Sequence, residues 1–193
     1  MLTLKVTTVY TWTALDPDTK LIAGFLVGKR DYEYAETFIR DLAGRLANKV
    51  QLTTDGHHAC LEAVEGAFGG EIDYAMLIKT YGPTPVQDQR RYSPAGFTGS
   101  EKRVITGAPD TAKISTSHVE RQNLTMRMSM RRFTRRTNGF SKKVFNLECA
   151  VGLHFMHYNF GRIHNTLGGV TPAMEAGISN HVWSLEEIAN LAK

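Results

Sequence analysis

The chain has 193 residues, 42% hydrophobic and 22% charged, with a net charge of +4, which is ordinary for one globular domain with a sizeable core. Its two cysteines, Cys60 and Cys149, lie far apart, which excludes a small disulfide scaffold and a closely spaced zinc site. No apolar run approaches the roughly 20 residues of a membrane span or the core of a signal peptide, so we expect a soluble, cytoplasmic protein without a membrane partner.

The N-terminal part alternates strand-like and helix-like segments. Residues 4–15 and 20–27 are rich in β-formers and flank a DPDT turn, which predicts a β-hairpin. Residues 31–47 carry apolar side chains at spacings of three and four, as in an amphipathic helix. A strand at 49–54, a helix at 58–68 and a weaker strand at 73–79 follow. This alternation predicts an α/β layer architecture.

The C-terminal part begins with a long segment of weak periodicity. Residues 81–117 gather Gly, Pro, Ser and Thr, and we interpret them as a functional insertion or a mobile loop. A basic helix follows, with a break at 137–139, and then a mostly apolar helix at 142–159. A final short helix is expected after Ser184, because serine is a favoured N-cap and Glu186 and Glu187 would lie in the first turn.

The segment from Ser117 to Lys143 concentrates the positive charge. It carries eight Lys and Arg residues and a single acid, Glu120. Such a stripe is expected of a nucleic-acid surface, although a solvated basic helix or a site for an acidic protein has the same composition. A lone carboxylate beside phosphate-binding groups is what metal-dependent phosphoryl transfer requires. We therefore favour DNA or RNA as the partner and Glu120 as a candidate metal ligand, with a solvated helix residue as the alternative.

Helical periodicity divides this segment into a polar stripe and an apolar edge. The stripe consists of Glu120, Asn123, Arg127, Arg131 and Arg135, and the edge of Val119, Met126, Met130 and Phe133. Arg127 would lie about two turns beyond Glu120, where a guanidinium can contact a phosphate next to the bond under attack. The candidate phosphate-binding residues are Arg121, Arg127, Arg131 and Arg132.

A second candidate carboxylate, Asp55, lies directly after the strand predicted at 49–54. Functional groups of open α/β sheets gather at the carboxyl ends of strands, and Gly56 permits a sharp turn there. The alternative is an N-cap for the following helix. If the fold brings Asp55 and Glu120 together, the two acids can share divalent cations.

Four blocks of the chain resemble the catalytic domain of bacterial insertion-sequence transposases of the DDE integrase type. The blocks are TWTALDPDTKLIAGFLVGKRD, RLANKVQLTTDGHHACLEAVEGAFG, ISTSHVERQNLTMRMSMRRFTRRTNGFSKK and HFMHYNFGRIHNTLGGVTPAMEAG. Together they cover nearly the whole chain, and the long basic block is the most specific. TTDG, or the YN and His of the last block, would be weak evidence alone. By this resemblance, residues 1–176 form the catalytic core and 177–193 a helical tail.

The resemblance implies a ribonuclease H-like fold, a mixed five-stranded sheet flanked by helices, with Mg²⁺ or Mn²⁺ held by two aspartates and a glutamate. Asp55 matches the second aspartate, Glu120 the glutamate, and Arg127 a basic DNA-contacting position. The family's late signature is matched by Tyr158, Asn159, Arg162 and His164, for which we expect a structural or DNA-proximal role. The implied reaction is in-line attack on a phosphodiester by water and then by a DNA 3′-hydroxyl.

The chain departs from the family pattern at its start. The segment TVYTWTALDPDTKLI resembles the strand after the one that carries the first aspartate, so that aspartate and its strand have no match. Asp16 and Asp18 are poor substitutes, because in this fold their turn lies at the opposite edge of the sheet. Segments that recognise transposon ends also have no match. We therefore expect an N-terminally shortened transposase.

Three functions remain open. The first is strand cleavage and transfer at Asp55 and Glu120, impaired because the first aspartate has no match. The second is a non-catalytic DNA-binding or regulatory fragment, and the third is a small metal-dependent nuclease. The expected partners are transposon-end and target DNA, with a homo-oligomer or a mixed oligomer with full-length transposase. The expected location is the bacterial nucleoid.

Overall fold

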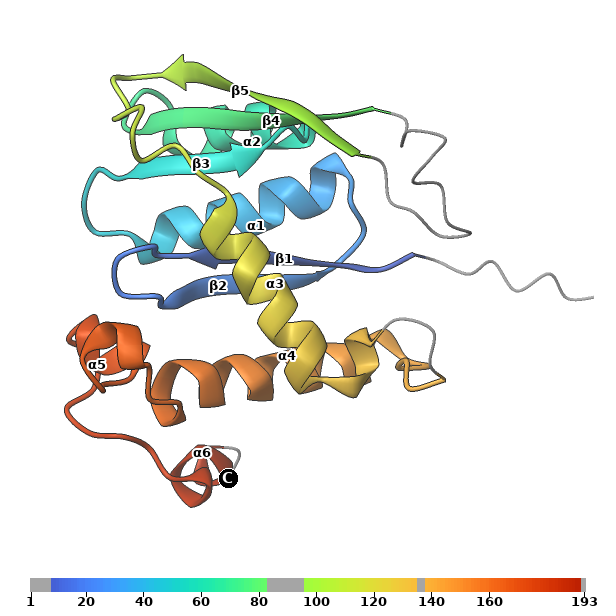
Figure 1. Cartoon of the computed structure of the whole chain (residues 1–193), viewed down its shortest axis with the longest axis vertical. Coiled ribbons are helices and arrows are strands. Elements are labelled where there is room, and N and C mark those ends of the chain that lie inside the picture. The colour runs from blue at the N-terminus through green and yellow to red at the C-terminus, as the bar shows by residue number, and fades with distance from the viewer. Residues whose placement is uncertain (1–7, 83–95, 135–137, 192–193) are drawn as a thin grey trace, which may run out of the picture.

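The computed structural model describes residues 8–82, 96–134 and 138–191. Within them, five strands form two sheets. β1 (Tyr10–Leu15) and β2 (Ile22–Gly28) make an antiparallel hairpin. β3 (Gln51–Asp55), β4 (Asp73–Gly82) and β5 (Gly96–Thr106) make a mixed sheet, with β4 parallel to β3 and antiparallel to β5. The α/β arrangement with a mixed sheet flanked by helices is thus confirmed (Figure 1).

Six α-helices lie in the described part of the chain and pack around the two sheets. They are α1 (Tyr32–Arg45), α2 (Ala59–Phe68), α3 (Ser117–Ser129), α4 (Val144–Met156), α5 (Pro172–Glu175) and α6 (Leu185–Asn190). Short helical turns η2 (Arg131–Phe133), η3 (His157–Gly161) and η4 (Asn165–Leu167) extend or connect them. In Figure 1, α3 crosses in front of α1 and of the β1–β2 hairpin. None of the described helices is long and apolar enough to cross a membrane.

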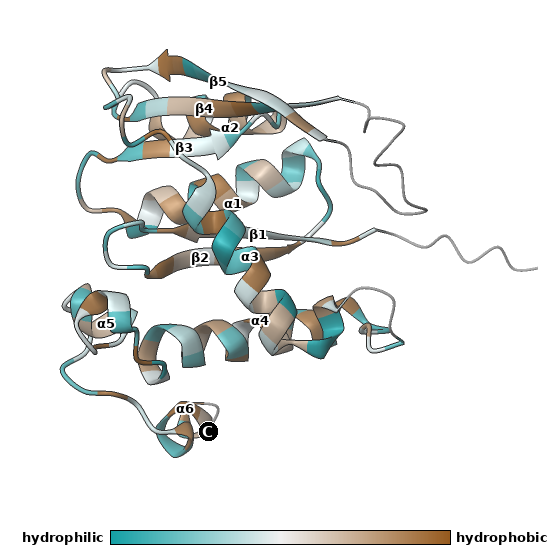
Figure 2. Ribbon diagram, viewed as in Figure 1, coloured by the Kyte–Doolittle hydropathy of each residue, from teal (hydrophilic) through white to brown (hydrophobic). Residues whose placement is uncertain are grey.

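Two apolar clusters hold these layers together. In the first, Phe38 and Ile39 of α1 and Val64 of α2 pack against Tyr74 and Met76 of β4. The central stretch of β4 is brown in Figure 2, and its side chains alternate between this cluster and the opposite face, where Ala75 and Leu77 pack with Ile114. The apolar stripe predicted for α1 is confirmed, because its members at positions 35, 38, 39 and 42 are buried. The side chain of Asp31 caps α1 by accepting from the backbone N–H of Tyr34.

The second cluster joins the hairpin to α3 and α4. Ile22 and Val27 of β2 pack against Met126 of α3 and against Val151 and Phe155 of α4. Met126, Met130 and Phe133 of the apolar edge predicted for the basic segment therefore face this cluster, and Val119 is not among its members. Association of apolar surface is the main favourable contribution to such packing. The cluster fixes the orientation of α3 over the hairpin.

The expectation of a structureless segment at 81–117 was wrong in part. β4 continues to Gly82 and β5 occupies Gly96–Thr106, while residues 83–95 lie outside the described residues. β5 pairs with β4 along its length, yet nearly all of its side chains are exposed. A strand with neither face buried shows no alternation of apolar and polar residues, which is why its pattern gave no strand signal.

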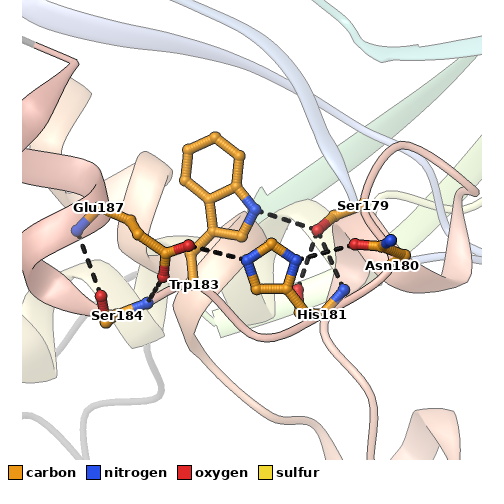
Figure 3. A network of polar contacts seen from close by, with 6 residues as sticks. All are labelled: Ser179, Asn180, His181, Trp183, Ser184 and Glu187. Carbon is orange, nitrogen blue, oxygen red and sulfur yellow. Dashed lines mark hydrogen bonds and ion pairs between the residues drawn. The ribbon is translucent and has the colours of Figure 1, made fainter.

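The C-terminal helix begins as predicted, with Ser184 as its N-cap. Ser184 and Glu187 form a capping box, in which the serine Oγ accepts from the N–H of Glu187 and the glutamate accepts from the N–H of Ser184. His181 bridges this box to the preceding turn, with its ring nitrogens 2.9 Å from Glu187 and 2.8 Å from Asn180 (Figure 3). These bonds lower the pKa of Glu187 to about 2.

Because the folded pKa of Glu187 lies below its ordinary value, its contribution to stability is present above about pH 4.5 and is lost as the pH falls towards 2. We expect α6 to fray in that window. The amide protection of α6, followed by hydrogen exchange, measures this directly. A Glu187→Gln variant should show α6 protection that no longer changes across the window, and an unchanged wild-type profile would contradict the assignment.

Candidate functional site

Asp55 is the last residue of β3 and is exposed at the carboxyl end of the mixed sheet. Its Oδ2 lies 3.0 Å from Nη2 of Arg30, which follows β2, and its Oδ1 accepts from the N–H of His57 at 3.2 Å. The alternative of a helix N-cap is wrong, because α2 begins later, at Ala59, after His58. The Asp55 carboxylate instead closes the turn after β3 and pairs with a cation from the hairpin.

Glu120 lies in the first turn of α3 and is also half-exposed. Its carboxylate accepts hydrogen bonds from the ammonium of Lys79, on β4, and from the hydroxyl of Thr116 at 2.7 Å. The bond from Lys79 is the main reason that the pKa of Glu120 lies below its ordinary value. Glu120 is therefore ionised and attached to the mixed sheet through Lys79.

Strand register places the two carboxylates on one face of the mixed sheet. Asp55 is aligned with Leu77 of β4, and partners in a parallel ladder point to the same side. Leu77 packs with Ile114, just before α3, whereas Tyr74 and Met76 face α1 and α2. Lys79, two residues beyond Leu77, shares its face and reaches Glu120. Asp55 and Glu120 thus lie at the same end of the same face, each held by its own cation.

The Lys79 contact gives a direct test of this geometry. Replacing Lys79 with Gln removes the strongest cause of the depressed pKa, so the pKa of Glu120 should rise towards its ordinary value. An NMR titration of the Glu120 carboxyl carbon measures the change. A matched control is Lys49→Gln, which removes the ammonium bound to Asp73 and should raise the pKa of Asp73 alone. An unchanged Glu120 titration in Lys79→Gln would show that the two side chains do not interact.

The candidate phosphate-binding arginines form an exposed basic face beside Glu120. Arg121 and Arg127 lie on α3, and Arg131 and Arg132 on η2, all of them exposed. Within the described residues, none of the four makes an ion pair with a carboxylate, although Arg132 donates to the hydroxyl of Ser141. Unpaired, exposed guanidinium groups are available to phosphate oxygens.

The basic helix is shorter than predicted. α3 ends at Ser129, and Met130 is extended, so Arg131 does not continue the stripe of Glu120 and Arg127. Arg135 lies outside the described residues. No proline or glycine marks this end in the sequence; Met130 and Phe133 instead turn into the cluster around β2 and α4. Tertiary packing therefore decides where the helix stops.

Three of the four late signature residues make contacts within the fold. Asn159 is buried, with its side chain accepting from the N–H of Ile22 and donating to the carbonyl of Ile22, both at 3.0 Å. The ring of Tyr158 packs edge-on against His164 at 4.8 Å between centroids. Arg162 is exposed. These contacts anchor the segment after α4 to β2.

The turn containing Asp16 and Asp18 closes the far end of the hairpin. The Asp16 carboxylate accepts from the N–H of Asp18 and from the hydroxyl of Thr19. Arg30, the partner of Asp55, follows the opposite end of β2. Neither aspartate of the turn therefore supplements Asp55.

Carboxylate oxygens such as those of Asp55 and Glu120 are ligands that divalent cations prefer. Binding of a cation would require the ion pairs of these two residues to break. Mg²⁺ is often bound by one or two carboxylates, with water and substrate phosphate oxygens as its other ligands. In the part of the chain that the structure describes, no three His, Cys, Asp or Glu side chains are grouped to hold a metal ion. A cation would compete with Arg30 and Lys79, whose exposed pairs are each worth about 0–1 kcal/mol.

Arg30 and Lys79 were missed by reasoning from the sequence. Arg30 follows a predicted strand and Lys79 ends one, so each looks like an ordinary polar residue at a strand end. Their relation to Asp55 and Glu120 depends on contacts between residues 25 and 41 positions apart.

Comparison of the chain with protein-family models, with curated proteins and with solved structures gave no match.

Proposed function

We propose that this chain is the catalytic core of a transposase with a ribonuclease H-like fold, which binds DNA through α3 and η2 and acts on a phosphodiester beside Asp55 and Glu120. The observation that supports it most is the placement of these two carboxylates at one end of one sheet face, next to exposed, unpaired arginines. Phosphoryl transfer depends mostly on positioning and on charge stabilisation, and carboxylates beside arginines are groups of the kind that it uses.

In this proposal the basic and the acidic residues have different roles. Arg127 and Arg121 would hold backbone phosphates along α3, while Asp55 and Glu120 would hold Mg²⁺ or Mn²⁺. The ion would stabilise the charge that develops on the attacked phosphate. Release of Lys79 from Glu120 would give a cation free to contact a DNA phosphate. Because the family's first aspartate has no match in these residues, we expect strand transfer by this chain to be strongly impaired or absent.

The test is cleavage and joining of a labelled DNA duplex by the whole chain. Products should appear with Mg²⁺ or Mn²⁺ and disappear when the metal is chelated. Cleavage without joining would point to the simple nuclease instead. Failure to bind DNA at low salt would overturn the proposal and its DNA-binding rival together.

The rival is a non-catalytic DNA-binding fragment of a transposase, which interferes by occupying DNA or by joining mixed oligomers. The specific observation in its favour is that both carboxylates are already paired with cations. It requires the basic face but not the carboxylates. DNA binding without metal-dependent products would select it.

DNA binding should depend on the basic face in either case. Replacing Arg127 and Arg131 with Gln should weaken binding and lower the slope of log affinity against log salt by about 2, because each phosphate contact contributes about one unit. The matched control is Arg40→Gln with Arg45→Gln on α1, which packs on the other side of the mixed sheet. Fluorescence anisotropy at several salt concentrations measures both variants, and equal slopes would exclude α3 and η2 as the DNA surface.

A further inference from the structure

Two aromatic rings lie exposed where the β4–β5 ladder extends past the end of β3 (Figure 1). Tyr81 of β4 is paired with Phe97 of β5, and their ring centroids are 6.2 Å apart in an edge-to-face arrangement. Their relative exposures are 58% and 61%, and neither ring belongs to an apolar cluster of the described residues. The two rings stabilise each other as a cross-strand pair, yet most of their surface is left for another molecule.

Both rings lie on the sheet face that carries the two candidate carboxylates. Tyr81 is two residues beyond Lys79 on β4, so alternation along the strand places both side chains on one side, about 7 Å apart along the strand. The opposite side is marked by Thr98, because a Cβ on Gly82 would meet its methyl group at 2.7 Å. Phe97 precedes Thr98 and therefore points to the side of Tyr81. The aromatic pair thus continues the face on which Lys79 reaches the candidate glutamate.

The charges on this face favour an anionic partner for the rings. Lys102 of β5 points to the same side as Lys79, because it is aligned with Leu77. It donates to a backbone carbonyl and makes no ion pair with a carboxylate in the described part of the chain. The acid of β5, Glu101, points to the other side, where it pairs with Arg103. Ammonium groups beside aromatic rings suit a nucleotide, whose phosphate is anionic and whose base is flat.

We propose that Tyr81 and Phe97 stack on the base of an unpaired nucleotide beside the phosphodiester under attack, so that the preferred substrate is DNA whose strands are separated at that point. In an intact duplex the neighbouring base pairs cover both faces of a base, whereas an unpaired base offers a face to an aromatic ring. The stacked base would hold one strand in place along the face of Lys79. This inference rests on the proposed function, because it names the form of DNA that the site takes.

The test compares the binding of two DNA duplexes by the whole chain in the presence of a chelator, so that no cleavage occurs. One duplex is fully paired, and the other has two unpaired nucleotides at one end, the last of them 2-aminopurine. The unpaired end should bind about tenfold more tightly, which is the size of effect expected for one base stacked on an aromatic side chain. The fluorescence of 2-aminopurine should fall on binding, because stacking quenches it.

Variants of the two rings separate stacking from phosphate binding. Tyr81→Ile together with Phe97→Ile keeps apolar, strand-forming side chains and removes the flat faces. This double variant should lose the tenfold preference and the quenching, but it should keep the dependence of affinity on salt, because no phosphate contact is changed. Tyr81→Phe should retain both the preference and the quenching. Tyr32→Ile, at an exposed tyrosine of α1, is the matched control and should behave as the wild type.

The outcomes distinguish this inference from the proposed function. Equal binding of the two duplexes by the wild type, or quenching that persists in the double isoleucine variant, would overturn stacking on Tyr81 and Phe97 and leave the proposed function standing. An equal loss of preference in Tyr32→Ile, or its loss in Tyr81→Phe, would also overturn it, because the ring faces at the end of the ladder would not be the cause. Failure to bind either duplex at low salt would overturn the proposed function and this inference together.

Discussion

Replacing Glu120 with Gln should lower metal-dependent cleavage of DNA by about 100-fold or more, while DNA binding stays the same or becomes tighter. The substitution keeps the size and polarity of the side chain and removes its negative charge. A metal ion would lose one of two carboxylate ligands, and charge stabilisation by such an ion is worth several kcal/mol at the attacked phosphate. DNA phosphates would meet less repulsion, because Lys79 would no longer be neutralised by Glu120.

The control is the same Glu→Gln substitution at a position where neither DNA nor a metal ion is expected to bind. Glu148→Gln, on α4, replaces an exposed glutamate outside the basic face and should leave both activity and affinity unchanged. Rates of product formation at saturating metal and DNA dissociation constants are measured for the three proteins. Loss of DNA binding in Glu120→Gln would mean that the residue positions α3 rather than taking part in chemistry. Unchanged cleavage would remove Glu120 from the site.

Asp55 and Glu120 show how far the sequence predicts the candidate site. The position of Asp55 at a strand end was predictable because a strand of β-forming residues stops at a glycine there. The isolation of Glu120 among arginines was visible in the charge pattern. Their shared face follows from the register of β3 on β4 and from the contact of Lys79 with α3, and neither pairing has a local signal. The sequence therefore predicts the two acidic residues but not the long-range pairing that places them on one face.

A helix or strand was predictable from the sequence when it buries one face and exposes the other. α1 buries one stripe and was predicted within two residues of its ends. β5 buries neither face and was missed, and α3 ends at Ser129 because of packing beyond the helix. Among the residues that the structure describes, the expected sheet of five strands is instead divided between the hairpin and the mixed sheet.

Replacing Asn159 with Ala should destabilise the protein by about 2–4 kcal/mol, because two buried backbone groups of Ile22 lose their partner at once. The side chain acts as a backbone mimic on β2, with its carbonyl accepting and its amide donating. Urea unfolding followed by circular dichroism measures the loss. Asn146→Ala, at an exposed position of α4, is the matched control and should lie within about 0.5 kcal/mol of the wild type.

An Asn159→Asp variant tests the donor separately from the acceptor. At neutral pH the carboxylate can still accept from the N–H of Ile22, but it repels the carbonyl of Ile22, so stability should fall. Below the pKa of this buried acid the protonated form regains a donor, and the gap to the wild type should narrow as the pH is lowered. Two results would contradict this: a stability difference between Asn159→Asp and the wild type that is independent of pH, or an Asn159→Ala variant as stable as the wild type. Either would mean that the two hydrogen bonds between Asn159 and Ile22 do not hold the segment after α4 to the hairpin. The late signature would then require a role in DNA binding rather than in the fold.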